Sequence, residues 1–283
     1  MQNDRDEAAG MKALRRHPVA AFLLLAFAIS WGGILVVCLP SGIPGRGAAL
    51  ESLFGPVFLF MLAGPFVAGT AMAFALDGRG GLAALFGGFT RWRVGAVDML
   101  LATCLIPACA LAVLLPLSLS SEAYVPGFLG GDGGVTMIAL FLAGGLMVAL
   151  IEETGWTGFA TPRMLERRGV LAVAVLLGVV HGVWHFLSNI WAEGAEFGPV
   201  FIPYFLTAWI LAVVNMRILA VRLYKRTGGS TLIGAVVHAS HTGGLLAIWP
   251  PATSPVQDLI WTSLFGVLGL VAVLAVTRTA HPS

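Results

Sequence analysis

Hydrophobic residues in this chain occur in long, nearly unbroken runs and do not alternate with polar ones. A helix that crosses the hydrocarbon core of a bilayer needs roughly 20 apolar residues, and eight runs are about that long. Short segments rich in glycine, proline and charge separate them, such as Pro250-Pro251-Ala252. The pattern predicts an all-α polytopic membrane protein with about eight transmembrane helices. The runs are 19–39, 53–76, 96–119, 135–159, 170–191, 200–221, 232–249 and 259–276.

The composition supports this interpretation. Of the 283 residues, 58% are hydrophobic and 11% are charged, whereas an ordinary soluble domain has about 25% charged residues. So few charges could not cover a soluble fold of this length, so lipid must face most of its surface. The net charge of +2 gives no reason to expect nucleic acid as a partner. The three cysteines lie inside apolar runs without metal-ligand spacing, and we interpret them as small buried hydrophobic residues.

The basic residues are segregated between alternate loops. All but one of the 16 lysines and arginines fall in the two tails or on one side of the predicted bundle, and Arg46 is the exception. Because positive charge disfavours translocation, both termini are predicted to be cytoplasmic and the number of spans to be even. We predict a single integral membrane domain over residues 1–283, multi-pass in the cell membrane, with a cytoplasmic tail at 1–17. The opposite side carries Glu122, Asp132, Glu193, Glu196 and Asp258.

Ionisable residues inside the predicted spans need a reason. A charged side chain at the bilayer centre costs about 2.5 to 3.5 kcal/mol on insertion scales. Three spans nevertheless place such groups at similar depth, roughly 12 to 22 Å from their cytoplasmic ends at about 1.5 Å per residue. We expect them to face one polar cavity at mid-membrane depth, around which the helices are arranged. They are Glu152, Glu153, His181, His185, His238 and His241, with Arg217 in another span.

Helical geometry sorts these groups by face. Residues four apart share a face, whereas neighbours point about 100° apart. His181 and His185 should therefore share a face, while Glu152 and Glu153 cannot both point at one substrate atom. We expect one glutamate to be catalytic and the other to support it. The sequence also allows both glutamates to be protonated and hydrogen-bonded to neighbouring helices, or to line an ion pathway.

Three motifs in the second half of the chain resemble the CAAX protease and bacteriocin-processing family of membrane proteins. Their order and spacing carry the resemblance, which covers a core at about residues 135–245. The resemblance implies an eight-helix intramembrane glutamate peptidase; some members trim prenylated CAAX termini and others are linked to bacteriocin processing or self-immunity. The motifs are Glu152-Glu153-Thr154-Gly155-Trp156-Thr157-Gly158-Phe159, then Trp184-His185, then Thr227-Gly228-Gly229-Ser230 leading to His238.

The resemblance also implies a role for each matching residue. Glu152 matches the glutamate that activates water, and His185 matches the histidine that assists it. His238 matches the histidine that stabilises the oxyanion, and Glu153 matches the second, supporting glutamate. Peptide hydrolysis needs these parts: an activated water, a proton carrier to the leaving amine, and donors aimed at the developing oxyanion.

Three further positions, interpreted as supporting residues, depart from the family pattern. Thr157 stands where an arginine is expected, so Glu153 lacks its usual counter-charge. His181 stands where an aromatic residue is expected, and Thr242 stands where asparagine is usual, so that one hydroxyl hydrogen replaces an amide. His181 and Arg217 are the candidates to replace the missing cation, because they share the depth of Glu153 or its side of the membrane.

Three hypotheses about function follow. The first is an intramembrane endopeptidase without a cofactor, acting on a peptide or membrane protein, lipidated or not, with the lipid bilayer as its surroundings. Here Glu152 and His185 should lie within about 6 Å of each other, close enough to share a water. The second is a non-catalytic immunity-type binding protein or carrier. The third is a zinc-dependent metallopeptidase whose ligands would be His181, His185, His238 and His241.

Overall fold

The computed structural model describes residues 11–129, apart from residue 13, and residues 134–278. Within these ranges the secondary structure is helical and has no strand. Three helices are short: α6 (Thr161–Leu165), α8 (Phe186–Phe197) and α9 (Phe201–Phe205). The longer ones are α2 (Pro18–Cys38), α3 (Ala48–Gly87), α4 (Ala96–Ser118), α5 (Gly134–Glu153), α7 (Val170–Trp184), α10 (Ala212–Arg226), α11 (Thr231–Ile248) and α12 (Pro255–Arg278).

The predicted membrane helices are confirmed. Seven helical segments in the described part of the chain are long and apolar enough to cross a membrane, and α7 is a shorter apolar helix of 15 residues. Large hydrophobic side chains point outward along them; Leu24 is 74% exposed and Val36 is 75% exposed. Such exposure is expected where lipid, not water, is the solvent.

The fifth predicted span differs from the structure. The run 170–191 is not one helix, because α7 ends at Trp184 and α8 begins at Phe186. The chain then passes through Gly198, whose φ of +48° favours glycine, into α9 and on to α10. Two stretches of π-helix, at Thr154–Ala160 and Leu206–Leu211, interrupt the predicted fourth and sixth spans. Hydrophobicity alone could not reveal these irregularities, since they do not change which residues are apolar.

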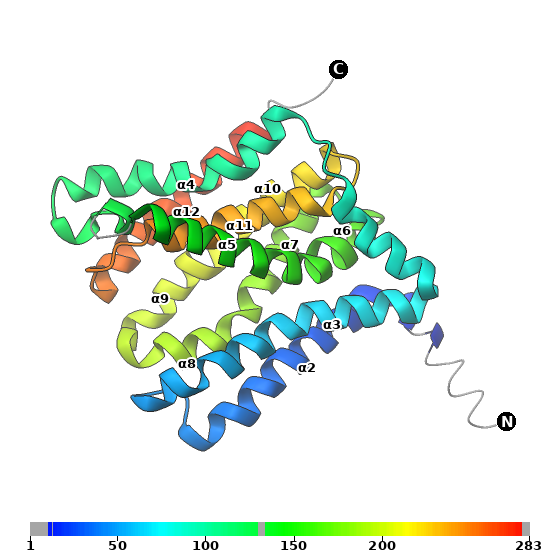
Figure 1. Cartoon of the computed structure of the whole chain (residues 1–283), viewed down its shortest axis with the longest axis horizontal. Helices are drawn as coiled ribbons and strands as arrows, with labels where there is room; N and C mark the ends of the chain where they lie inside the picture. The colour runs from blue at the N-terminus through cyan, green and yellow to red at the C-terminus, as the bar shows by residue number, and fades with distance from the viewer. Residues whose placement is uncertain (1–10, 13, 130–133, 279–283) are drawn as a thin grey trace.

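Close approach of small residues packs the helices around the polar positions. Figure 1 shows α2 and α3 running side by side along one edge of the bundle, with α5, α10, α11 and α12 gathered on the other side. Between α5 and α11, a Cβ on Gly145 would lie 2.6 Å from the backbone nitrogen of Gly243. These two glycines therefore allow a backbone contact that a larger residue would prevent, as is typical of packed membrane helices.

The ends of the helices alternate as the charge pattern predicted. In Figure 1 the start of α2 and the connections α3–α4, α6–α7 and α10–α11 lie together at the right-hand end of the bundle. The connections α2–α3, α8–α9 and α11–α12 lie at the opposite end. The basic segments are therefore on one side of the protein, and we propose that this side faces the cytoplasm.

Cysteine labelling tests this orientation. In a variant whose native cysteines are replaced by alanine, a cysteine at Glu166 should not react with an impermeant thiol reagent added to intact cells. Glu166 is exposed in the basic α6–α7 connection, so the same cysteine should react once the membrane is opened. A cysteine at Glu122, in the α4–α5 connection, is the matched control and should react from outside. Labelling of the first variant in intact cells would reverse the proposed orientation.

Candidate active site

Glu152 and Glu153 form the last turn of α5, where the helix passes into the π-helix at Thr154–Ala160. Both are buried, with exposures of 3% and 0%. The wider turn is seen in the backbone bond from Thr161 N–H to the carbonyl of Trp156, five residues earlier. Such π-bulges are frequent at functional sites. The glycines of this segment let α3 approach it, since a Cβ on Gly69 would lie 2.9 Å from the Cα of Gly155.

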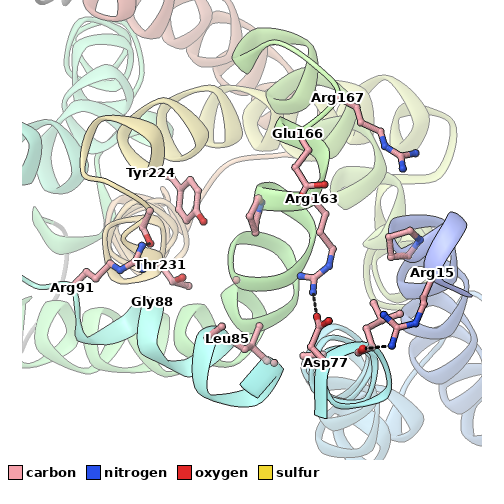
Figure 2. Close-up of a pocket in the computed structure, with 18 residues that line it drawn as sticks. Arg15, Asp77, Leu85, Gly88, Arg91, Arg163, Glu166, Arg167, Tyr224 and Thr231 are labelled. Carbon is pink, nitrogen blue, oxygen red and sulfur yellow. Dashed lines mark hydrogen bonds and ion pairs between the residues drawn. The ribbon is translucent and has the colours of Figure 1, made fainter. Parts of the chain in front are cut away.

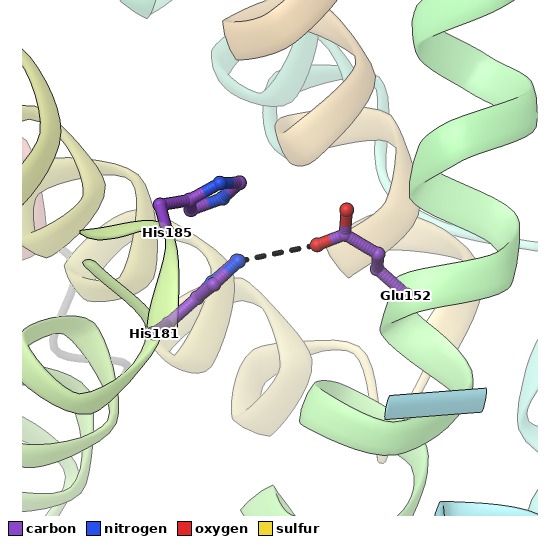
Figure 3. A group of neighbouring side chains, drawn as sticks. All are labelled: Glu152, His181 and His185. Carbon is purple, nitrogen blue, oxygen red and sulfur yellow. Dashed lines mark hydrogen bonds and ion pairs between the residues drawn. The ribbon is translucent and has the colours of Figure 1, made fainter. Parts of the chain in front are cut away.

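Glu152 faces two histidines across the interior of the protein. Its Oε2 lies 3.2 Å from Nε2 of His181. The rings of His181 and His185 are stacked with centroids 5.2 Å apart, as their spacing of four residues predicted. Figure 3 shows the three side chains converging from α5, α7 and the junction between α7 and α8, and one ligand atom of each lies within 4.8 Å of the others. The expected proximity of Glu152 and His185 is therefore confirmed.

Glu153 points to a different group of partners, as the rotation along the helix predicted. Arg217 binds it through two parallel hydrogen bonds, 2.6 Å from Nη2 to Oε1 and 2.7 Å from Nη1 to Oε2. The Nδ1 atom of His238 lies 2.7 Å from Oε1, and the Thr157 hydroxyl donates to Oε2. The carboxylate is thus surrounded by donors. Arg217 supplies the counter-charge that Thr157, in the usual position of an arginine, cannot give.

Arg217 also fixes the protonation of His181. Its Nε and Nη2 atoms lie 3.1 and 2.8 Å from Nδ1 of His181. A guanidinium can only donate hydrogen bonds, so Nδ1 accepts, and the ring hydrogen of a neutral His181 is on Nε2. That hydrogen points to Glu152. A fully buried arginine on α10 therefore orients both glutamates, one directly and the other through His181.

The position of His238 is set by the turn before α11. Gly228 and Gly229 have φ of +65° and +88°, a conformation that side chains disfavour. Arg91 donates to both of their carbonyl oxygens, at 2.6 and 3.1 Å. Ser230 then caps α11 by accepting from the backbone N–H of Ile233, at 3.2 Å. The Thr227–Ser230 motif therefore starts the helix that carries His238 two turns later.

One cavity of about 640 Å³ joins the candidate residues. The supporting residue Thr242 also lines it, whereas Glu153 does not. His241 lines it too and is 7% exposed, and its Nδ1 has no hydrogen-bond partner among the described residues. The rest of the wall is mainly apolar and comes from α3, α5, α8, α10, α11 and the segment before α10. The candidate catalytic side chains in the wall are Glu152, His185 and His238, with His181 beside them.

Sequence reasoning missed the aromatic surroundings of the histidines. The ring of Trp156 stacks on His181 with a centroid distance of 4.7 Å. Trp184 and Trp209 lie against His185, each at 4.7 Å. Trp156 and Trp184 could have been noticed, because both belong to the motifs. Trp209 could not, because it reaches the site through the second π-helix, whose presence the hydrophobic pattern does not signal.

Glu152, His181 and His185 carry the nitrogen and oxygen ligand atoms that zinc binds. Among the described residues these are the three whose ligand atoms converge, and His238 and His241 are not part of the group. A metal ligand must offer a lone pair, yet the nitrogen of His181 that faces Glu152 carries a hydrogen while Arg217 donates to the other. The arrangement therefore does not fit a metal bound by His181.

A second cavity of about 480 Å³ opens at the basic end of the bundle. Figure 2 shows Arg163 reaching Asp77 and the guanidinium of Arg15 bound to a backbone carbonyl, that of Leu76. None of the candidate catalytic side chains lines this cavity. One residue that lines this second cavity, Gly158, is next to Thr157 in the sequence.

A comparison with known families extends the resemblance noted in the sequence. Residues 134–244 match the family model described as type II CAAX prenyl endopeptidase Rce1-like. The comparison with curated proteins found no match. The matched segment begins at α5 and ends within α11, so it contains Glu152, His185 and His238. Residues 134–244 are therefore the part of this multi-pass membrane protein that is similar to the type II CAAX prenyl endopeptidase family.

Proposed function

We propose that this protein is an intramembrane endopeptidase that hydrolyses a peptide bond with a water activated by Glu152. The observation that carries the proposal is the convergence of Glu152, His181 and His185 on one cavity in a membrane-spanning bundle, with Glu152 and His181 buried. Burial keeps bulk water away, so a single water held there meets a base in a medium of low dielectric constant. The most direct test is the loss of cleavage in a Glu152→Gln variant.

Glu152 is the general base in this mechanism, and His185 is its partner. Ligand atoms within 4.8 Å of each other leave room for one water bound to both side chains. Glu152 takes a proton from that water as it attacks the carbonyl carbon, and then returns the proton to the leaving amine. His181 donates to Glu152 and holds its carboxylate in place.

His238 is proposed to stabilise the oxyanion. Its Nδ1–H donates to Glu153, so Nε2 is the nitrogen left to face the cavity, and Nε2 donates to the oxyanion when the ring carries both hydrogens. Thr242 lies four residues later on the same face of α11 and lines the same cavity. Its hydroxyl can donate a second hydrogen bond to the developing negative charge, in place of the asparagine amide usual in the family.

Glu153 and Arg217 are proposed to organise the site without touching substrate. Adjacent carboxylates in a medium of low dielectric constant repel each other strongly when both are ionised. The bidentate pairing with Arg217 neutralises Glu153, so that Glu152 can carry the charge of the base. Neither Arg217 nor Glu153 lines the cavity, which agrees with a positioning role.

The shape of the cavity favours a hydrophobic substrate. Phe54, Phe58, Leu140 and Met147 form part of the wall next to the bilayer, and each is also exposed or partly exposed on the surface of the bundle. A membrane-embedded or lipid-modified peptide could therefore enter from the side. Because the matched family is described as a prenyl endopeptidase, a peptide with a prenylated cysteine near its C-terminus is the first substrate to test.

We propose that catalysis requires no metal, and chelation tests this. Purified active protein incubated with a strong zinc chelator and then desalted should keep its full rate, because His181 has no free lone pair toward Glu152. Metal analysis of the same sample should find much less than one zinc per protein. Loss of activity on chelation, with recovery on return of zinc, would contradict the metal-free mechanism.

A further inference from the structure

The cavity has a second polar wall that the proposed mechanism does not use. Glu193, on α8, lines the same cavity as Glu152, and its Oε2 is buried without a hydrogen-bond partner among the described residues. Asn189 lies one turn earlier on the same helix face and is 7% exposed. It lines the same cavity, and its Nδ2 is also buried and lacks a partner there. An acceptor and a donor therefore lie side by side in one wall.

The charge of this wall is not balanced from within the cavity. No lysine or arginine is among the described residues that line it. A carboxylate removed from water without a counter-charge is unfavourable, and a cation from a ligand would relieve this. Trp209, whose side chain interacts with Glu193, lines the cavity as well, but it is neutral and supplies no counter-charge. The chemistry of the wall matches an ammonium or guanidinium group next to a carbonyl.

We propose that Glu193 and Asn189 form a subsite for a basic side chain of the substrate. Glu193 follows His185 by eight residues, which corresponds to about 12 Å of helix. An extended peptide covers that distance in about three or four residues. The preferred peptide should therefore carry lysine or arginine three or four residues from the bond that is cut. This last statement rests on the proposed peptidase function, whereas binding of a cation at the subsite does not.

Binding can be measured without catalysis. In protein carrying Glu152→Gln, the fluorescence of the cavity tryptophans reports the binding of dodecylammonium or of uncharged dodecanol, added to protein in a neutral detergent. We expect the ammonium to bind about tenfold more tightly than the alcohol. A hydrogen bond between charged groups stabilises a complex by enough free energy to change the dissociation constant by about that factor. Adding Glu193→Gln should remove this preference and leave the binding of dodecanol unchanged.

Glu196→Gln is the matched control, because Glu196 lies on the same helix but is exposed and does not line the cavity. It should keep the preference for the ammonium. Equal binding of ammonium and alcohol by protein with Glu193 intact would overturn the subsite, whether or not any variant folds. An unchanged preference after Glu193→Gln would overturn it as well.

A cleavage experiment separates this inference from the proposed function. Wild-type protein is given membrane-inserted peptides in which a single lysine is moved along the sequence, and the cut positions are read by mass spectrometry. Cuts that follow the lysine at a fixed spacing in wild type, but not in Glu193→Gln, support the subsite. Cuts that ignore the lysine overturn the subsite and leave the peptidase intact. If no peptide is cut but the protein still prefers the ammonium, the proposed peptidase function is contradicted and the subsite is not.

Discussion

Replacement of Arg217 by glutamine should both destabilise the protein and abolish cleavage. The side chain is fully buried and makes two hydrogen bonds of 2.6 and 2.7 Å to Glu153. Removing one partner of a buried ion pair leaves the other charge uncompensated, which costs about 3 to 5 kcal/mol. The variant also loses the donor that fixes the ring of His181. Thermal unfolding of purified protein in detergent, together with an assay of peptide cleavage, measures both effects.

Two control variants make this prediction specific. Arg226→Gln removes an arginine of the same helix that is 31% exposed and pairs with Asp98, so stability should fall by less than in Arg217→Gln, whose side chain is fully buried. The double variant Arg217→Gln with Glu153→Gln removes both charges, and should recover part of the lost stability while staying inactive. A single Arg217→Gln variant as stable and as active as wild type would show that the arginine does not organise the site.

The depth of the site could be predicted from the sequence, because helices fix the rise per residue. Glu152 precedes the basic turn at Arg168 by about as many residues as His185 follows it, and the two side chains do meet. The split between Glu152 and Glu153 followed from rotation along the helix in the same way. The depth and the direction of a side chain can thus be predicted from its position in the sequence wherever the helix is regular.

The partners of Arg217 show where this reasoning stops. Its position inside a predicted span indicates a functional role. It is also one of the two residues that the sequence offers as a counter-charge for Glu153 in place of an arginine at position 157. Which of its neighbours it contacts depends on how α10 is rotated against α5 and α7, and a single sequence does not contain that information. The break at His185 and the two π-helices escape prediction for a related reason, since both depend on packing and not on which residues are apolar.

The family resemblance and the structure agree on the matched core but differ in which residue supplies the positive charge next to Glu153. At position 157 the resemblance predicts an arginine one turn after Glu153, and threonine stands there instead. The structure places a cation on Glu153 from another helix, so the charge is kept while its origin changes. A departure from a motif therefore need not mean loss of activity, provided that a group elsewhere in the chain fills the same place.

Replacement of Glu152 by glutamine is expected to have the largest effect on activity and little effect on stability. Glutamine keeps the size of the side chain and an oxygen that can accept from His181, but it cannot take a proton from water. Loss of a general base lowers rates by about 10²- to 10⁴-fold, so cleavage should fall below detection in most assays. Glu166→Gln changes an exposed glutamate that does not line the cavity with Glu152, so it is the control and should cleave like wild type.

The most direct measurement compares the new N-termini of membrane-protein fragments in cells that produce wild-type or Glu152→Gln protein at equal levels. The proposed mechanism predicts a set of fragments that appears with the wild type and is absent with Glu152→Gln, although both proteins unfold at the same temperature. The same fragments in both cell lines would contradict the assignment of Glu152 as the base, and would favour a binding protein or carrier instead.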